Sequence, residues 1–105
     1  MTTLTEFLLA RIAEREMLAR DMQHMAAIGR PLLELRGGGT LGRDLVDPAR
    51  VLAECEAKRE VVNAAGYHLE FGRVTPESED LALSILRALA LPYADHPDYR
   101  MVRHP

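Results

Sequence analysis

Three helix-start signals constrain the fold of this chain more than any other feature of its sequence. Thr3 and Glu6 match a capping box, in which the N-cap hydroxyl and the carboxylate three residues later satisfy each other's backbone amides. Asp47–Pro48 and Thr75–Pro76 each place a capping side chain before a proline, which suits the first helical position because no N–H is needed there. The sequence therefore predicts three helices.

Apolar spacing and breakers set the extent of each helix. The first is expected over about 4–28, because Pro31 cannot continue it, and the third ends before Pro92. The second is expected to end at Gly66, a natural residue after a helix C-cap. On the first helix, three- and four-residue spacing predicts a buried stripe of Leu4, Leu8, Ile12, Leu18, Met22 and Met25, and a solvated face that carries Arg11, Arg15 and Arg20.

The two connections differ in character. Tyr67, Leu69 and Phe71 alternate as in a short strand, but no partner strand is evident, so we expect an ordered connection that lays these aromatics on the core. Residues 36–46 are glycine-rich and predict a flexible loop; a phosphate cradle is the weaker alternative, because no strand or phosphate-binding motif accompanies it. Together these features predict an all-α fold: a small three-helix bundle in a single domain over 1–105, with a long N-terminal helix and an ordered non-helical C-terminal tail.

Charge and composition narrow the function classes. The formal net charge is −3, which argues against nucleic acid as a partner, although Arg50, Lys58 and Arg59 form a local basic group. No apolar run reaches the roughly 20 residues of a membrane-spanning helix. Cys55 is the only cysteine and no secretory signal is visible, so a reducing, cytoplasmic setting is expected. Cys55 itself is read as a small core residue rather than a nucleophile.

The C-terminal tail holds the densest group of chemically capable side chains. As a functional site, a histidine between carboxylates would act as a general base or bind a divalent metal, with His68 or His24 as further ligands. As a structural element, the aspartates and prolines form turns and the tyrosines pack on helix ends. The structural interpretation is favoured, and no catalytic residue, metal site or cofactor is assigned. The candidate functional residues of the tail are Tyr93, Asp95, His96, Asp98 and Tyr99.

Four stretches carry a family resemblance. Residues 4–11, 47–52, 56–59 and 89–100 resemble an uncharacterised family of small proteins from actinobacteria and their phages. That family usually closes with an acidic pair, a tryptophan, an arginine and a proline, whereas residues 101–105 here lack the acids and the tryptophan. The resemblance implies a lineage and a cytoplasmic home, and it implies no reaction.

The favoured function is a small helical protein that binds or modulates another protein. The alternatives are a nucleic-acid-associated factor and a small metal-dependent or histidine-based enzyme that uses Asp95, His96 and Asp98. A long amphipathic first helix also predicts a homodimer through residues 4–28. The candidate interaction surface consists of Leu8, Ile12, Met22 and Met25.

Overall fold

The computed structural model describes residues 2–28 and 47–103. The glycine-rich stretch 36–46, for which a flexible loop is predicted, lies outside the described residues. Two compact units make up the chain: one comprises residues 1–11 and 58–105, and the other residues 12–57. Each unit is described by itself, and a single domain over 1–105 stays a prediction.

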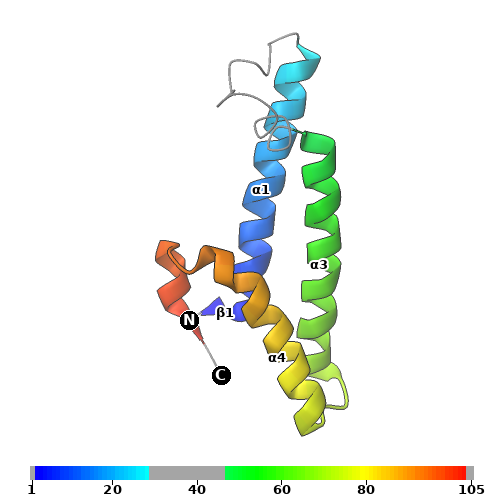
Figure 1. Ribbon diagram of the computed structural model, residues 1–105, viewed down its shortest axis with the longest axis vertical. Coiled ribbons are helices and arrows are strands. Elements are labelled where there is room, and N and C mark those ends of the chain that lie inside the picture. Colours follow the sequence, from blue (N-terminus) through cyan, green and yellow to red (C-terminus); the bar gives the residue numbers. More distant parts are fainter. Residues whose placement is uncertain (1, 29–46, 104–105) are drawn as a thin grey trace. The chain divides into compact units, whose positions relative to one another are not determined.

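Three α-helices account for most of the described chain, and the predicted all-α three-helix bundle is confirmed (Figure 1). They are α1 (Leu4–Ala27), α3 (Pro48–Phe71) and α4 (Pro76–Ala90). The tail continues from α4 through two 3-10 helices, η2 (Leu91–Tyr93) and η3 (Pro97–Met101). Two very short strands, β1 (Thr2–Thr3) and β2 (Val102–Arg103), then pair in parallel and join the two ends of the described chain.

The predicted helix starts form as the sequence indicates. The backbone N–H of Glu6 donates to Thr3 Oγ1 over 3.1 Å, and Thr3 N–H donates to Glu6 Oε1 over 3.4 Å. Before α3, Asp47 Oδ1 accepts a hydrogen bond from the backbone N–H of Arg50 over 3.3 Å. Before α4, Thr75 Oγ1 accepts from Ser78 N–H over 3.1 Å, while Ser78 Oγ accepts from Thr75 N–H over 2.8 Å. Ser78 therefore occupies the N3 position of this capping box, as Glu6 does in α1.

The helix α3 continues past Gly66 to Phe71, so the predicted end at Gly66 is wrong. Gly66 serves a close approach of two elements instead. A Cβ atom on Gly66 would lie 2.9 Å from both Oγ1 and Cγ2 of Thr5, in the first turn of α1. A glycine is needed here because it lets the start of α1 come against the backbone of α3, and a helix interior tolerates it at a modest cost in stability.

The buried stripe of α1 is partly as predicted. Leu4, Leu8 and Ile12 are buried, and so is Ala19, whereas Leu18 is 61% exposed. A helical residue advances about 100° around the axis, so position 19 lies within roughly 20° of position 12, while position 18 lies roughly 120° away. Leu18 therefore points to another face, and the stripe continues through a smaller side chain.

The geometry at Gly66 generates a test. We expect Gly66→Ala to lower the free energy of unfolding by about 1 kcal/mol, because the clash with Thr5 outweighs alanine's better helix propensity. In a Thr5→Ala background the clash is removed, and the same substitution should raise the free energy of unfolding by about 1 kcal/mol. Urea denaturation of the wild type, the two single variants and the double variant measures both effects, and a stabilising Gly66→Ala in the wild-type background would contradict the close approach.

Candidate functional site

The tail folds back as a series of short turns. The N–H of Ala94 donates to Leu91 O over 3.1 Å, that of His96 to Tyr93 O over 2.9 Å, and that of Tyr99 to His96 O over 3.0 Å. β2 then pairs with β1 in the register Thr2 to Val102. The tail is therefore ordered without α-helix, as predicted.

Phe7 is the point on which the aromatic rings of the tail converge. It is 2% exposed, and its ring lies edge-to-face against Tyr93, His96 and Tyr99, with centroid distances of 6.2, 5.8 and 5.8 Å. Edge-to-face pairs contribute about 0.5–1.5 kcal/mol each beyond the area they bury. Three of the five candidate tail residues thus pack on the first helix, which supports their structural interpretation.

Arg11 contacts this aromatic cluster through Phe7 and His96. The prediction that Arg11 lies on a solvated face is therefore wrong. The side chain is 7% exposed, with its guanidinium carbon 5.1 Å from the centroid of the Phe7 ring. Its Nη1 lies 2.8 Å from His96 Nδ1 and 2.7 Å from His96 Nε2, and 3.5 Å from Asp98 Oδ2. The sequence carried one signal for this placement, since Arg11 follows Phe7 by four residues and so shares its face of the helix.

Both ring nitrogens of His96, the atoms that would carry out acid–base or metal chemistry, are in contact with other groups. Its Nδ1 accepts the backbone N–H of Asp98 over 3.0 Å, so His96 caps η3. Because the Arg11 guanidinium carries a fixed positive charge within 2.8 Å of both ring nitrogens, a metal ion would be repelled from them. Asp95, the remaining candidate of the tail, is exposed. The arrangement suits a latch that holds the tail against α1.

A metal centre finds no further support in the part of the chain that the structure describes. No three histidine, cysteine, aspartate or glutamate side chains gather there in a way that could hold a metal ion. His68, one of the two further ligands considered, lies with its Nε2 2.9 Å from Ser78 Oγ. Cys55 is 1% exposed, in keeping with a small core residue.

The candidate interaction surface on α1 divides into two kinds of residue. Leu8 and Ile12 are 1% and 3% exposed, so they belong to the core and offer no free surface. Met22 and Met25 are partly exposed. The large apolar side chains that this helix exposes are instead Met17 and Leu18, at 66% and 61%.

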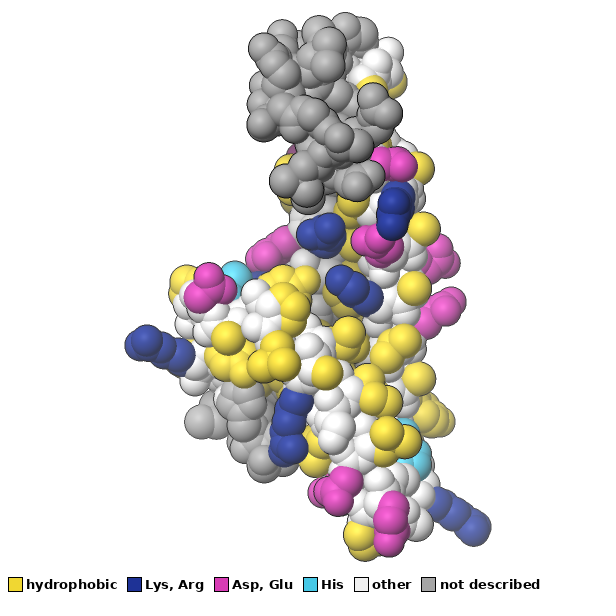
Figure 2. All heavy atoms as spheres, in the orientation of Figure 1, with side chains coloured by type: hydrophobic (Ala, Val, Ile, Leu, Met, Phe, Trp, Pro, Cys, Tyr) yellow, Lys and Arg dark blue, Asp and Glu magenta, His cyan; other side chains and the backbone are white. Residues whose placement is uncertain are grey.

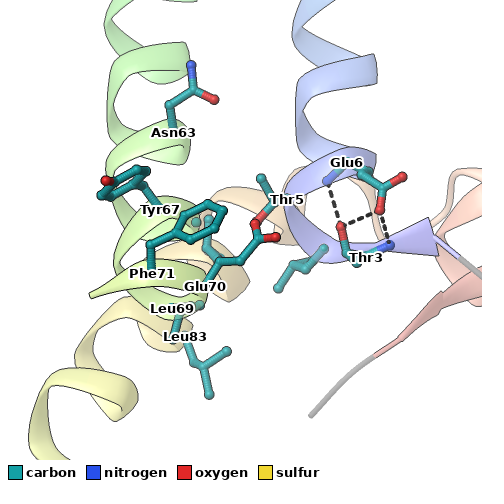
Figure 3. Close-up of a pocket in the computed structure, with 12 residues that line it drawn as sticks. Thr3, Thr5, Glu6, Asn63, Tyr67, Leu69, Glu70, Phe71 and Leu83 are labelled. Atoms are coloured by element: carbon teal, nitrogen blue, oxygen red, sulfur yellow. Dashed lines mark hydrogen bonds between the residues drawn. The ribbon is translucent and has the colours of Figure 1, made fainter. Parts of the chain in front are cut away.

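A cavity of about 670 Å³ opens where the start of α1 meets the end of α3 and the middle of α4 (Figure 3). All of its lining lies in the unit of residues 1–11 and 58–105. Sequence reasoning missed this site, because it depends on α3 continuing beyond Gly66. The lining residues are Thr3, Leu4, Thr5, Glu6, Asn63, Gly66, Tyr67, Leu69, Glu70, Phe71, Leu83 and Leu86.

Two aromatic rings stand at the edge of the cavity. Tyr67 and Phe71 are 66% and 65% exposed, so the expectation that they lie on the core is wrong. Because α3 continues as a helix, these residues are one turn apart on one face, and their ring centroids lie 5.1 Å apart. In Figure 3, Phe71 and Glu70 extend from α3 toward the start of α1.

The polar groups of the cavity are acidic or neutral. Its charged lining residues are Glu6 and Glu70, and its lining includes no lysine or arginine. Glu6 is engaged in the capping box with Thr3. The Glu70 carboxylate, among the described residues, makes neither a hydrogen bond nor an ion pair. A free carboxylate therefore lies next to an exposed aromatic pair.

Comparison with protein families places the chain. A model described as a family of unknown function (DUF6221) matches residues 1–102. The chain belongs to this family. Comparisons with curated proteins and with solved structures give no match. Within the described residues, no helix is long and apolar enough to cross a membrane.

The latch around Arg11 yields a prediction for this family member. In Arg11→Met the stem is kept, but the guanidinium no longer contacts His96 or Asp98, and we expect amide exchange of residues 93–102 to accelerate at least about tenfold, which corresponds to about 1.4 kcal/mol. Arg15→Met is the matched control, since Arg15 is exposed on the same helix and should leave the tail protected. Hydrogen exchange followed by mass spectrometry compares the two, and equal protection in both variants would refute the latch.

Proposed function

We propose that this protein is a cytoplasmic, non-enzymatic binding protein that holds a segment of a protein partner in the cavity between α1, α3 and α4. The observation that carries the proposal is the exposed pair Tyr67 and Phe71 at the edge of an apolar cavity. Aromatic side chains are enriched where partners bind, since they offer a large contact area at a low cost in conformational entropy. A buried thiol at Cys55 suits the reducing compartment.

The tail supports this site without forming part of it. Phe7 holds the tail rings, while Thr3, Leu4, Thr5 and Glu6, which directly precede it, line the cavity. One turn of α1 therefore contacts the tail on one side and the cavity on the other. By fixing that turn, the tail gives the cavity a rigid wall, and a preformed wall lowers the entropy lost when a partner binds.

Affinity capture from the native cytoplasm tests the proposal. The baits are the wild type, Tyr67→Ala/Phe71→Ala and the control Leu91→Ala/Met101→Ala, which removes equally exposed apolar side chains that do not line the cavity. Since all four residues are exposed, we expect each double variant to keep its free energy of unfolding within about 1 kcal/mol of the wild type. A partner that is lost from the first double variant and retained by the second supports the cavity.

A protein partner retained by Tyr67→Ala/Phe71→Ala would contradict the proposed site. A fourth bait, truncated after Leu91, separates the two roles of the tail. Weakened capture of the same partner is expected because the cavity wall at Thr3–Glu6 loses its support. Unchanged capture would show that the tail is not needed to position that wall.

Self-association through residues 4–28 is a second proposal, favoured by the exposed Met17 and Leu18. We expect sedimentation at high micromolar concentration to show a dimer that Leu18→Asp dissociates without unfolding the chain. Leu8→Asp is the contrasting variant: because Leu8 is 1% exposed, it should lose the helical circular dichroism of the chain. A strict monomer for the wild type would refute the dimer.

A further inference from the structure

We propose that the cavity recognises a basic amphipathic peptide segment, whose apolar side chains enter between α1, α3 and α4 and whose lysine or arginine lies against Glu70 and the Tyr67–Phe71 rings. This inference deepens the proposed function and rests on it. The chemistry of the partner follows from the apolar lining of the cavity and from the carboxylate of Glu70, which is unpaired among the described residues.

The interior of the cavity is suited to aliphatic or aromatic side chains. Leu4 and Leu86 are 5% and 1% exposed and form buried parts of the lining, while Leu69 and Leu83 are partly exposed. A volume of about 670 Å³ lies within the range of roughly 300–1,000 Å³ that is usual for ligand sites. It can admit several side chains of a peptide, and amphipathic helices bind to apolar grooves through side chains one turn apart.

The edge of the cavity favours a cation. Glu70 adds a carboxylate that no described residue neutralises, and Tyr67 and Phe71 add two exposed aromatic rings from the same turns of α3. The negative face of an aromatic ring attracts lysine and arginine, and a carboxylate pairs with either. A lysine or arginine that follows an apolar side chain would meet both partners at once.

The surrounding charge favours the same partner. Of the six charged residues within 63–87, the stretch that holds the lining of α3 and α4, four are acidic and two, Arg73 and Arg87, are basic. Acidic side chains gather at the first turn of α4, and hydrophobic side chains extend along the helix beyond it (Figure 2). An anionic partner such as nucleic acid would be repelled here, whereas a basic peptide would be attracted over roughly 8–10 Å, the screening length at physiological salt.

A displayed library of random peptides of about 12 residues tests the inference. The library is selected on the wild type and depleted on Tyr67→Ala/Phe71→Ala, so that the recovered peptides depend on the aromatic pair. We expect them to be enriched in lysine or arginine next to apolar residues. Their binding to the purified full chain, measured by fluorescence anisotropy, should weaken about 3-fold in Glu70→Gln and at least about 10-fold in Glu70→Lys.

Glu56→Lys is the matched control for Glu70→Lys, because it makes the same change in net charge at an exposed position of the same helix that does not line the cavity. It should weaken binding less than 2-fold. Recovered peptides that depend on Tyr67 and Phe71 but carry no excess of basic residues would overturn the basic chemistry and leave the proposed function standing. If no recovered peptide depends on the aromatic pair, both proposals fail.

Discussion

The packing of the tail on Phe7 is the interaction on which the rest of this structure depends. Phe7 is almost fully buried, and three rings from the tail lie edge-to-face against it. Arg11, one turn further along α1, adds its guanidinium to Phe7 and His96. These contacts join residues 85 to 92 positions apart in sequence, and the closure of so long a loop must be offset by strong contacts at its ends.

The same contacts explain why the chemically capable tail does not resemble a catalytic centre. A catalytic histidine needs a free nitrogen that faces substrate, and a metal ligand needs a free lone pair that faces the ion. In this chain Nδ1 of His96 accepts the N–H of Asp98, and the Arg11 guanidinium approaches both ring nitrogens. His96 thus connects a turn of the tail to a buried cation.

The helix starts could be predicted from the sequence because they depend on neighbouring residues. The roles of Gly66 and Arg11 could not, because they depend on residues distant in sequence. Thr3, Asp47 and Thr75 were identified as helix starts because a cap is satisfied within three or four residues. The prediction for Gly66 is wrong because this glycine accommodates the side chain of Thr5, which lies 61 positions earlier. The prediction for Arg11 is wrong for the same kind of reason, since its partners in the tail are not apparent from the spacing of the first helix.

Some residues of the chain have no role in holding the fold together, and others have one. Glu77 and Glu79 stabilise the positive end of the α4 dipole, so their presence is explained without a partner. Leu86 and Leu4 fill the core. Tyr67 and Phe71 do neither: a helix of this length would form with polar residues at both positions, and two large exposed rings on its last turns promote association with other molecules. Glu70 lies between them in sequence and has no partner among the described residues. Binding of a partner would explain why all three side chains are present, and the cavity that they line is where the bound segment would lie.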